Sequence, residues 1–201
     1  LAEQYFWSGD YVNARTYYER CLALAPDEIK THEALSQLCV KTGDSAQAIR
    51  WAQRALGYPH PDSFSTAWGY YILGGAYEAA SRHEERRDAM KASNQLWPCN
   101  LFASEVAKAH EALGETELAI ESYREALRHV PDSNHTRFDL GRVYATTGRI
   151  REAEAEYRVL LRSGYKKAPD LARIIAESRK RRPAIEAPPP PTEPAKPKKR
   201  P

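Results

Sequence analysis

Histidine and glutamate side chains are the first candidates for chemistry, and the stretch RHEERR places His83 beside Glu84. A zinc-protease helix needs a second histidine four residues after the first, but Arg87 occupies that position. The six histidines are scattered along the chain, and the three cysteines have neither metal-ligand nor disulfide spacing. The sequence therefore predicts no metal site and no cofactor.

The glycines and the other carboxylates also lack a catalytic arrangement. Gly74 and Gly75 lie inside a helical pattern, and neither a GxGxxG nor a GxxxxGK(S/T) phosphate-binding motif occurs. The glutamates of residues 151–157 are typical of a solvated helix face, and His110 is expected to be a packed or partly exposed ring. We therefore predict no catalytic residue and expect that the chain is not an enzyme.

The net charge is small but unevenly distributed. The chain has 201 residues and a formal net charge of +3. From Lys166 onward it has eleven basic and four acidic residues, a net charge of +7, which leaves −4 for the first 165 residues. No run of eighteen apolar residues occurs, so we expect no membrane span. Cys21 and Cys39 are expected to pack as small hydrophobic residues, which favours the cytoplasm, with the periplasm as the alternative.

A 34-residue period is the strongest signal in the sequence. Gly148 lies 34 residues after Gly114, and the same step joins Ala153 to Ala119. Two upstream copies have the same small residues, at Gly9 and Ala14 and at Gly43 and Ala48. The chain is therefore expected to repeat one structural unit.

Each copy has the pattern of two amphipathic helices joined by a turn. In the last copy, Leu140 and Tyr144 recur at helical spacing before Gly148, and Ala153 and Tyr157 do so after it. Prolines follow the second helix of three copies, at Pro26, Pro98 and Pro131. Because one pair of helices cannot bury its apolar stripe alone, we expect neighbouring pairs to stack.

One copy departs from this pattern. It has Ser81 in place of the turn glycine and Arg86 in place of the small residue of the second helix. The stretch GYPHPDSF before this copy predicts a longer loop. We therefore expect the stacking of helices to differ locally there.

The pattern resembles the tetratricopeptide repeat family, whose helix-turn-helix signature has a leucine–glycine pair, a tyrosine, an alanine, an aromatic residue and a closing proline. The match is closest at Leu140, Gly141, Tyr144, Gly148, Ala153 and Tyr157. The resemblance implies an all-α, right-handed α-solenoid of about five repeats that binds a protein or a peptide. The repeats are expected at residues 1–27, 28–64, 65–98, 99–132 and 133–166.

The two ends of the chain differ from the repeats. Leu1 falls on the leucine position of its repeat, so we expect a truncated first repeat with under-buried apolar residues. The sequence predicts a C-terminal capping helix over residues 167–182, with Leu171 and Ile175 on its apolar face. Residues 183–201 are rich in proline and lysine, and we expect a disordered tail, either solvated or a polyproline ligand.

The resemblance implies that the first helices of successive repeats form a concave face for an extended or helical peptide. Trp68 and Tyr71 are the expected anchors, because large aromatic residues often dominate the binding energy of interfaces. Lys108 and Arg142 are expected to select acidic side chains. The full set of expected peptide-binding residues is Phe6, Trp7, Lys30, Gln37, Lys41, Trp68, Tyr71, Glu105, Lys108, His135, Phe138 and Arg142.

Three functions are compatible with the sequence. The first, which we favour, is a protein–protein interaction scaffold. The second is a repeat appendage of a larger enzyme, a kinase or a glycosyltransferase, whose catalytic domain lies upstream. The third is binding of an anionic ligand through the basic C-terminal end. Because no aromatic residue is interleaved with the basic residues there, we expect no nucleic-acid partner.

Overall fold

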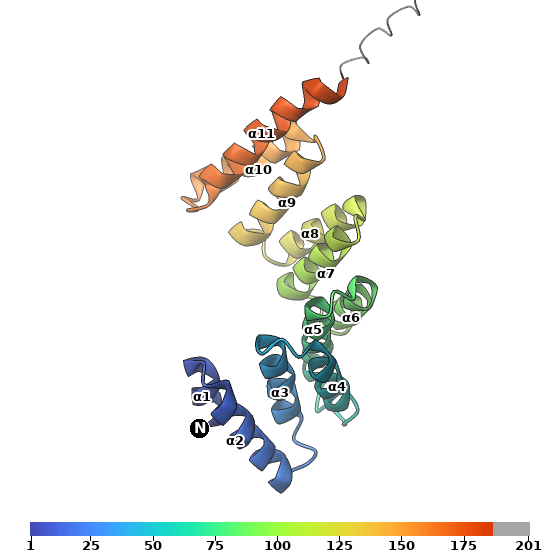
Figure 1. Cartoon of the computed structure of the whole chain (residues 1–201). Helices are drawn as coiled ribbons and strands as arrows, with labels where there is room; N and C mark the ends of the chain where they lie inside the picture. Colours follow the sequence, from blue (N-terminus) through green and yellow to red (C-terminus); the bar gives the residue numbers. More distant parts are fainter. Residues whose placement is uncertain (187–201) are drawn as a thin grey trace, which may run out of the picture. The chain divides into compact units, whose positions relative to one another are not determined.

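A computed structural model gives the structure of residues 1–186, with side chains through Arg181, and this part of the chain has eleven helices and no strand (Figure 1). The all-α repeat fold expected from the sequence is confirmed. The first ten helices follow one another as five pairs. In chain order the helices are α1 (Ala2–Ser8), α2 (Tyr11–Leu24), α3 (Ile29–Lys41), α4 (Ser45–Leu56), α5 (Ser63–Ala79), α6 (His83–Leu96), α7 (Asn100–Ala112), α8 (Thr116–His129), α9 (Asn134–Thr146), α10 (Ile150–Arg162) and α11 (Ala168–Glu186).

Turns of one kind join the two helices of a pair. Four of these turns have a glycine in the left-handed backbone region, at Gly9, Gly43, Gly114 and Gly148. Aspartates cap three of the helices in the first half of the chain, with Asp10 accepting a hydrogen bond from the backbone N–H of Asn13 at 3.1 Å. The side chain of Asp44 accepts a hydrogen bond from the backbone N–H of Gln47 at 3.0 Å, and Asp62 accepts one from Ser65 at 2.7 Å. These local features explain where the helices start and where the chain reverses.

Ser81 occupies the turn of the α5–α6 pair, with a φ of 56°. A left-handed conformation costs a non-glycine residue about 1–2 kcal/mol, and the larger conformational entropy of unfolded glycine offsets part of that difference. We therefore expect Ser81→Gly to raise the free energy of unfolding by about 0.5–1 kcal/mol in urea denaturation. The reverse change, Gly43→Ser, is the matched control and should be destabilising. Lower stability of Ser81→Gly would contradict the strain argument.

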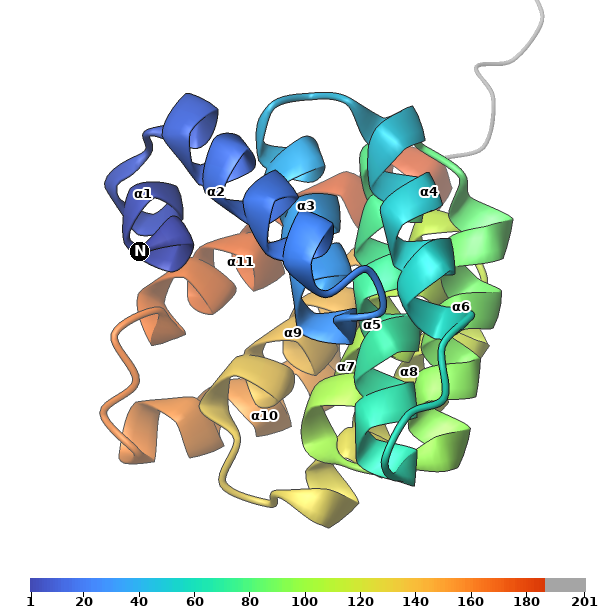
Figure 2. The ribbon, with the colours of Figure 1, turned by 90° about the horizontal axis from the view of Figure 1, so that it is seen from below.

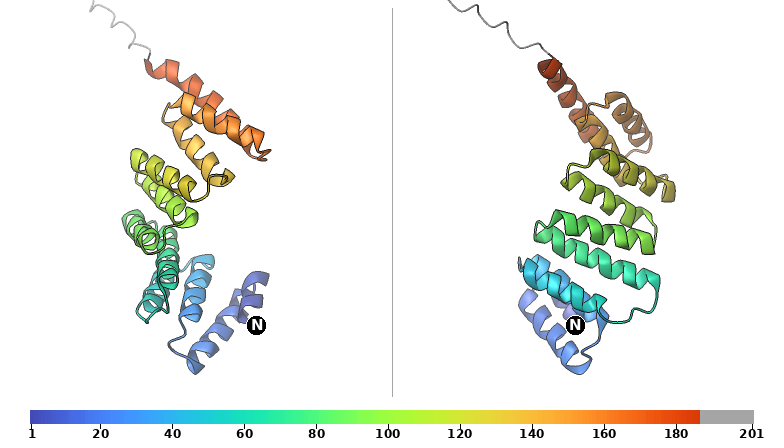
Figure 3. Two further views of the ribbon diagram at one scale, coloured as in Figure 1. Left: turned by 180° about the vertical axis from the view of Figure 1, so that it is seen from behind. Right: turned by 90° about the vertical axis from the view of Figure 1, so that its right-hand side faces the viewer.

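Residues 1–140 form a first compact unit, called the first unit below, in which successive helix pairs stack. Helices α5 to α8 lie side by side in the right-hand view of Figure 3, and α3 contacts both α4 and α5 (Figure 2). The alanines at the repeated positions Ala14, Ala48 and Ala119 are fully buried. Their small side chains allow the backbones of paired helices to approach closely.

The first helix pair exposes several apolar side chains, as the sequence predicted for Leu1 and its neighbours. Leu1 is exposed, and Tyr5 is half-buried and stacks on Tyr17 with ring centroids 5.3 Å apart. Trp7 is 81% exposed, whereas the adjacent Phe6 is buried. Phe6 packs in a cluster with Ala14, Tyr18, Leu35 and Leu38.

A second compact unit begins at Gly141, within α9. Its helices α10 and α11 contact each other, and Leu160 and Leu171 are fully buried. A Cβ atom at Gly141 would lie 2.7 Å from Cδ2 of Leu171 and 3.3 Å from Cβ of Glu156. The absence of a side chain at Gly141 therefore allows α9 to approach both later helices of this unit.

Two local features differ from the sequence-based expectations. Cys39 is buried, but Cys21 is exposed, because Leu22 rather than Cys21 packs against the core of the first pair. Helix α11 continues to Glu186, four residues past the expected boundary at 182. Residues 187–201, which belong to the expected disordered tail, lie outside the described residues.

Within residues 1–186, no helix has both the length and the apolar character needed to cross a membrane.

Candidate functional site

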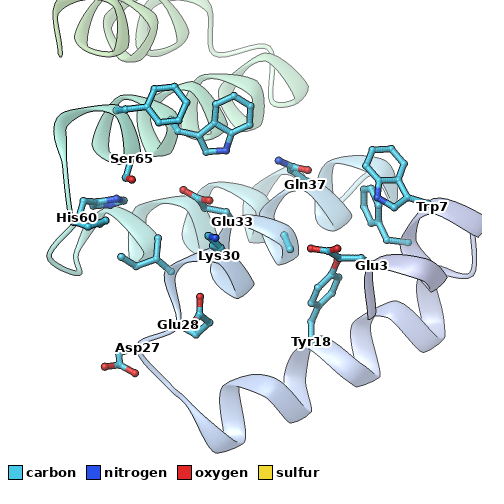
Figure 4. A pocket seen from close by; sticks show the side chains of 16 residues that line it. Glu3, Trp7, Tyr18, Asp27, Glu28, Lys30, Glu33, Gln37, His60 and Ser65 are labelled. Carbon is cyan, nitrogen blue, oxygen red and sulfur yellow. The ribbon is translucent and has the colours of Figure 1, made fainter. Parts of the chain in front are cut away.

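Helices α1, α3 and α5 of the first unit border a cavity of about 630 Å³. Figure 4 shows Glu3 and Trp7 on α1, Glu33 and Gln37 on α3, and other side chains from the segment that leads into α5. Cavities that hold ligands in proteins usually have volumes of roughly 300–1,000 Å³. The cavity is therefore large enough for several residues of a bound segment.

An aromatic row follows α5 along one wall of this cavity. The ring centroids of Phe64 and Trp68 lie 6.3 Å apart, and those of Trp68 and Tyr71 lie 5.1 Å apart. At one end of the row, Phe64 contacts Trp97 edge-on at 5.6 Å, and at the other Tyr71 contacts Phe102 at 5.8 Å. Phe64 and Trp97 are exposed whereas Phe102 is buried, so the row runs from the surface into the core. Trp68, in its middle, lines the cavity.

Glu33 of α3 contributes a partly desolvated carboxyl group to the cavity. Burial raises the pKa of Glu33 to about 7, and the positive charge of Lys30 opposes that shift only in part. Among the side chains that the structure describes, none forms a hydrogen bond or a salt bridge with the Glu33 carboxylate. An unpaired carboxylate in such surroundings is unfavourable, which makes Glu33 the chemically most demanding group of the cavity.

Carboxylates outnumber cationic groups in the cavity lining. The lining includes the single ammonium group of Lys30 and the imidazole of His60. Both ring nitrogens of His60 are buried and lack a hydrogen-bond partner within the described part of the chain. The four lining carboxylates are those of Glu3, Asp27, Glu28 and Glu33. The electrostatic environment is therefore acidic, and it contains two polar groups without partners.

Six of the twelve predicted site residues meet in or beside this cavity. Phe6, Trp7, Lys30, Gln37 and Trp68 line it, and Tyr71 packs against Trp68. These residues come from three different helices, as expected for a face built by the first helices of successive repeats. Lys41 is exposed at the end of α3 and does not line the cavity.

The remaining predicted residues lie elsewhere. Lys108 of α7 binds Glu105, with 2.7 Å between Nζ and Oε1, and Glu105 also pairs with Arg86 at 3.2 Å. Lys108 is therefore already engaged by a carboxylate. On α9, His135 is exposed and Phe138 is half-buried, and neither lines the cavity; Arg142 belongs to the second unit.

Sequence reasoning did not identify Glu33, His60 or Phe64 as site residues. Glu33 lies three residues after Lys30 and four before Gln37. Helical spacing therefore places Glu33 on the same face as these two predicted residues, and the sequence could have indicated it. His60 lies in the long α4–α5 connection and Phe64 at the start of α5. The sequence predicted only a longer loop there, and that loop brings both side chains to the cavity.

Comparison with known proteins agrees with this repeat architecture. Two sequence profiles of the tetratricopeptide repeat match residues 1–58 and 106–172. The helix pairs, their turn glycines and their buried alanines define a helical-repeat protein. With the profile matches, these features show that the chain belongs to the tetratricopeptide repeat family. Proteins of this fold typically serve as non-catalytic scaffolds for protein interactions.

Several solved structures share the fold. MamA is 22% identical with a TM-score of 0.69, and the match covers 84% of this chain and 97% of that one. The pilF protein of Pseudomonas aeruginosa is 16% identical with a TM-score of 0.70, covering 92% and 89%. YrrB, described as a TPR protein with an unusual peptide-binding site, is 15% identical with a TM-score of 0.64, covering 84% and 85%.

One curated relative is much longer than this chain. The human protein O-mannosyl-transferase TMTC1 is 24% identical over 163 residues. The match covers 78% of this chain but only 18% of the relative's length. The similarity therefore concerns a small part of that protein.

Proposed function

We propose that the first unit holds an extended or helical segment of a partner protein in the cavity bordered by α1, α3 and α5. The observation that carries this proposal is the aromatic row of α5, in which Trp68 lines the cavity and contacts Tyr71 with the two rings tilted by 37°. Trp7 adds a ring that is 81% exposed. Large exposed aromatic surfaces are unfavourable in water, and they are frequent centres of binding energy when a partner covers them.

The charges near this cavity change one part of the sequence-based hypothesis. That hypothesis assigned the selection of acidic side chains to Lys108 and Arg142. Lys108 is bound by Glu105, and the cavity lining is mainly acidic. We therefore assign the anchoring role to Trp68 and Tyr71 and do not retain selection of acidic side chains.

The test uses the double variant Trp68→Ala/Tyr71→Ala. A photo-crosslinking residue at Gln37, inside the cavity, first identifies a partner, with the same group at the exposed Glu121 as the reference position. Loss of two central aromatic side chains should then weaken binding of that partner by roughly 2 kcal/mol or more, measured by calorimetry.

Trp97→Ala is the matched control for this test. Trp97 is exposed and contacts Phe64, but it does not line the cavity, so its removal should change affinity much less. Circular dichroism should show that helicity is retained in both variants. Unchanged affinity in a folded double variant would mean that the partner binds elsewhere on the chain.

A second candidate function follows from the similarity to the O-mannosyl-transferase. In this case the chain would be the repeat region of a larger glycosyltransferase, and the cavity would bind either another part of that enzyme or its protein substrate. An antibody against the first unit would detect the intact protein in cells. A single band near the 22.8 kDa of this chain would exclude this candidate.

A further inference from the structure

Two features of the proposed binding cavity together favour one chemical class of ligand. The first is the acidic lining: Glu3, Asp27 and Glu28 are exposed, whereas Glu33 is partly buried and forms no hydrogen bond or salt bridge with the described side chains. The second is the indole ring of Trp68 in the same lining. Aromatic faces and carboxylates both attract cations.

We propose that this cavity binds a lysine or arginine side chain of the partner segment, with the cationic head beside Glu33 and the aliphatic stem along Trp68. The inference rests on the proposed function and adds the chemistry of the partner. Lysine and arginine combine an apolar stem with a charged end, which matches a lining that is aromatic on α5 and carries carboxylates on α1, on α3 and just before α3. The exposed carboxylates would also attract a basic segment as it approaches.

Other ligand groups suit the cavity less well. An acidic side chain would meet four carboxylates and a single ammonium group. A wholly apolar segment would remove water from Glu33 without supplying a positive charge, and a buried carboxylate without a partner is costly. A cationic side chain supplies the partner that the described structure leaves absent.

Proton binding at Glu33 should make this interaction depend on pH. Because burial raises the pKa of Glu33 to about 7, the carboxyl group is mostly protonated at pH 6 and mostly ionised at pH 8. A bound cation favours the ionised form, so affinity should rise between pH 6 and pH 8. The other titratable or charged groups that line the cavity are Glu3 on α1, Tyr18 on α2, Asp27, Glu28 and Lys30 near the start of α3, and His60 before α5. Because His60 lines the same cavity, the variant His60→Asn separates the contribution of this ring from that of Glu33.

A random-peptide display library, selected against the whole chain at pH 8, supplies the probe. We expect the selected peptides to share a lysine or arginine next to an apolar residue. One such peptide is then compared by calorimetry with an analogue that has norleucine at the basic position, which keeps the stem and removes the charge. The analogue should bind about tenfold more weakly or worse at pH 8, because it lacks a charge-assisted interaction.

Glu33→Gln removes the charge from the protein side and keeps the shape of the side chain. This variant should bind the basic peptide and its norleucine analogue with similar affinity, and it should lose the increase in affinity between pH 6 and pH 8. Glu121→Gln is the matched control, because Glu121 is an exposed glutamate on α8 outside the cavity lining. It should retain both the tenfold difference and the pH dependence.

The outcomes separate this inference from the proposed function on which it rests. Selected peptides without a shared basic residue, or a norleucine analogue that binds the wild-type chain equally well, would overturn the inference while leaving the cavity as the binding site. If the selected peptides bound Trp68→Ala/Tyr71→Ala as tightly as the wild type, or if selection yielded no binding peptide, the proposed function itself would fail.

Discussion

Phe102→Ala is expected to lower the free energy of unfolding of the first unit by about 3–5 kcal/mol. The Phe102 side chain is 1% exposed, and its ring lies 5.8 Å from the ring of Tyr71. Its removal therefore leaves a space at the contact between α5 and α7, beneath the aromatic row, in addition to the loss of buried apolar surface. Urea denaturation followed by circular dichroism measures this difference.

Leu101→Ala provides the comparison at the neighbouring position of the same helix. Leu101 is 41% exposed, so its truncation should cost less than about 1 kcal/mol. Because repeats contact mainly their neighbours, hydrogen exchange should show that Phe102→Ala weakens α5 to α8 more than α1 and α2. Equal costs for the two substitutions would show that Phe102 does not form part of the core.

Much of the fold was predictable because its determinants are local and recur along the chain. The 34-residue step predicted equivalent positions for Ala119 and Ala153, and both are fully buried. It also predicted a turn at residue 81, where serine adopts the left-handed conformation of the glycines. The buried alanines and the turns can be predicted from a periodic sequence, because the same residue types recur at the same positions in each copy of the helix pair.

The candidate site was less predictable because it depends on contacts between repeats. The helical pattern placed Trp68 and Lys30 on the inward face of their helices. It did not predict that α1, α3 and α5 would lie close enough together to border a cavity. The i,i+3 spacing of Glu105 and Lys108 on α7 allowed their ion pair, but it gave no indication that Glu105 would also pair with Arg86 of α6. A prediction of free charges needs the identity of every neighbouring side chain, and that information is not contained in the spacing of one helix.

Arg86 shows how a departure from the repeat pattern is accommodated. It replaces the small residue of the second helix, yet its side chain is buried. Nη2 lies 3.2 Å from Oε2 of Glu105 on α7, and Nη1 lies 3.3 Å from Oε1 of Glu78 on α5. The guanidinium group therefore joins the α5–α6 pair to α7 through ion pairs, at a position where the other repeats pack an alanine.

Glu105→Leu should therefore lower the free energy of unfolding by about 3–5 kcal/mol, because it removes the better-buried partner of a buried cation. The Arg86 side chain is 5% exposed, and its remaining partner, Glu78, is 57% exposed and compensates the charge poorly. Urea denaturation gives the cost. Glu85→Gln breaks the exposed pair between Arg82 and Glu85 and serves as the control, with little change expected.

The double variant Arg86→Met/Glu105→Leu distinguishes an unpaired charge from a loss of packing. Replacing both ions by apolar side chains of similar size removes the unpaired charge, so stability should return to within about 1 kcal/mol of the wild type. If the double variant were as unstable as Glu105→Leu alone, the cost would arise from packing or from the Lys108 contact. Recovery would instead show that the two ions need each other, which explains how an arginine can replace the small residue of this repeat.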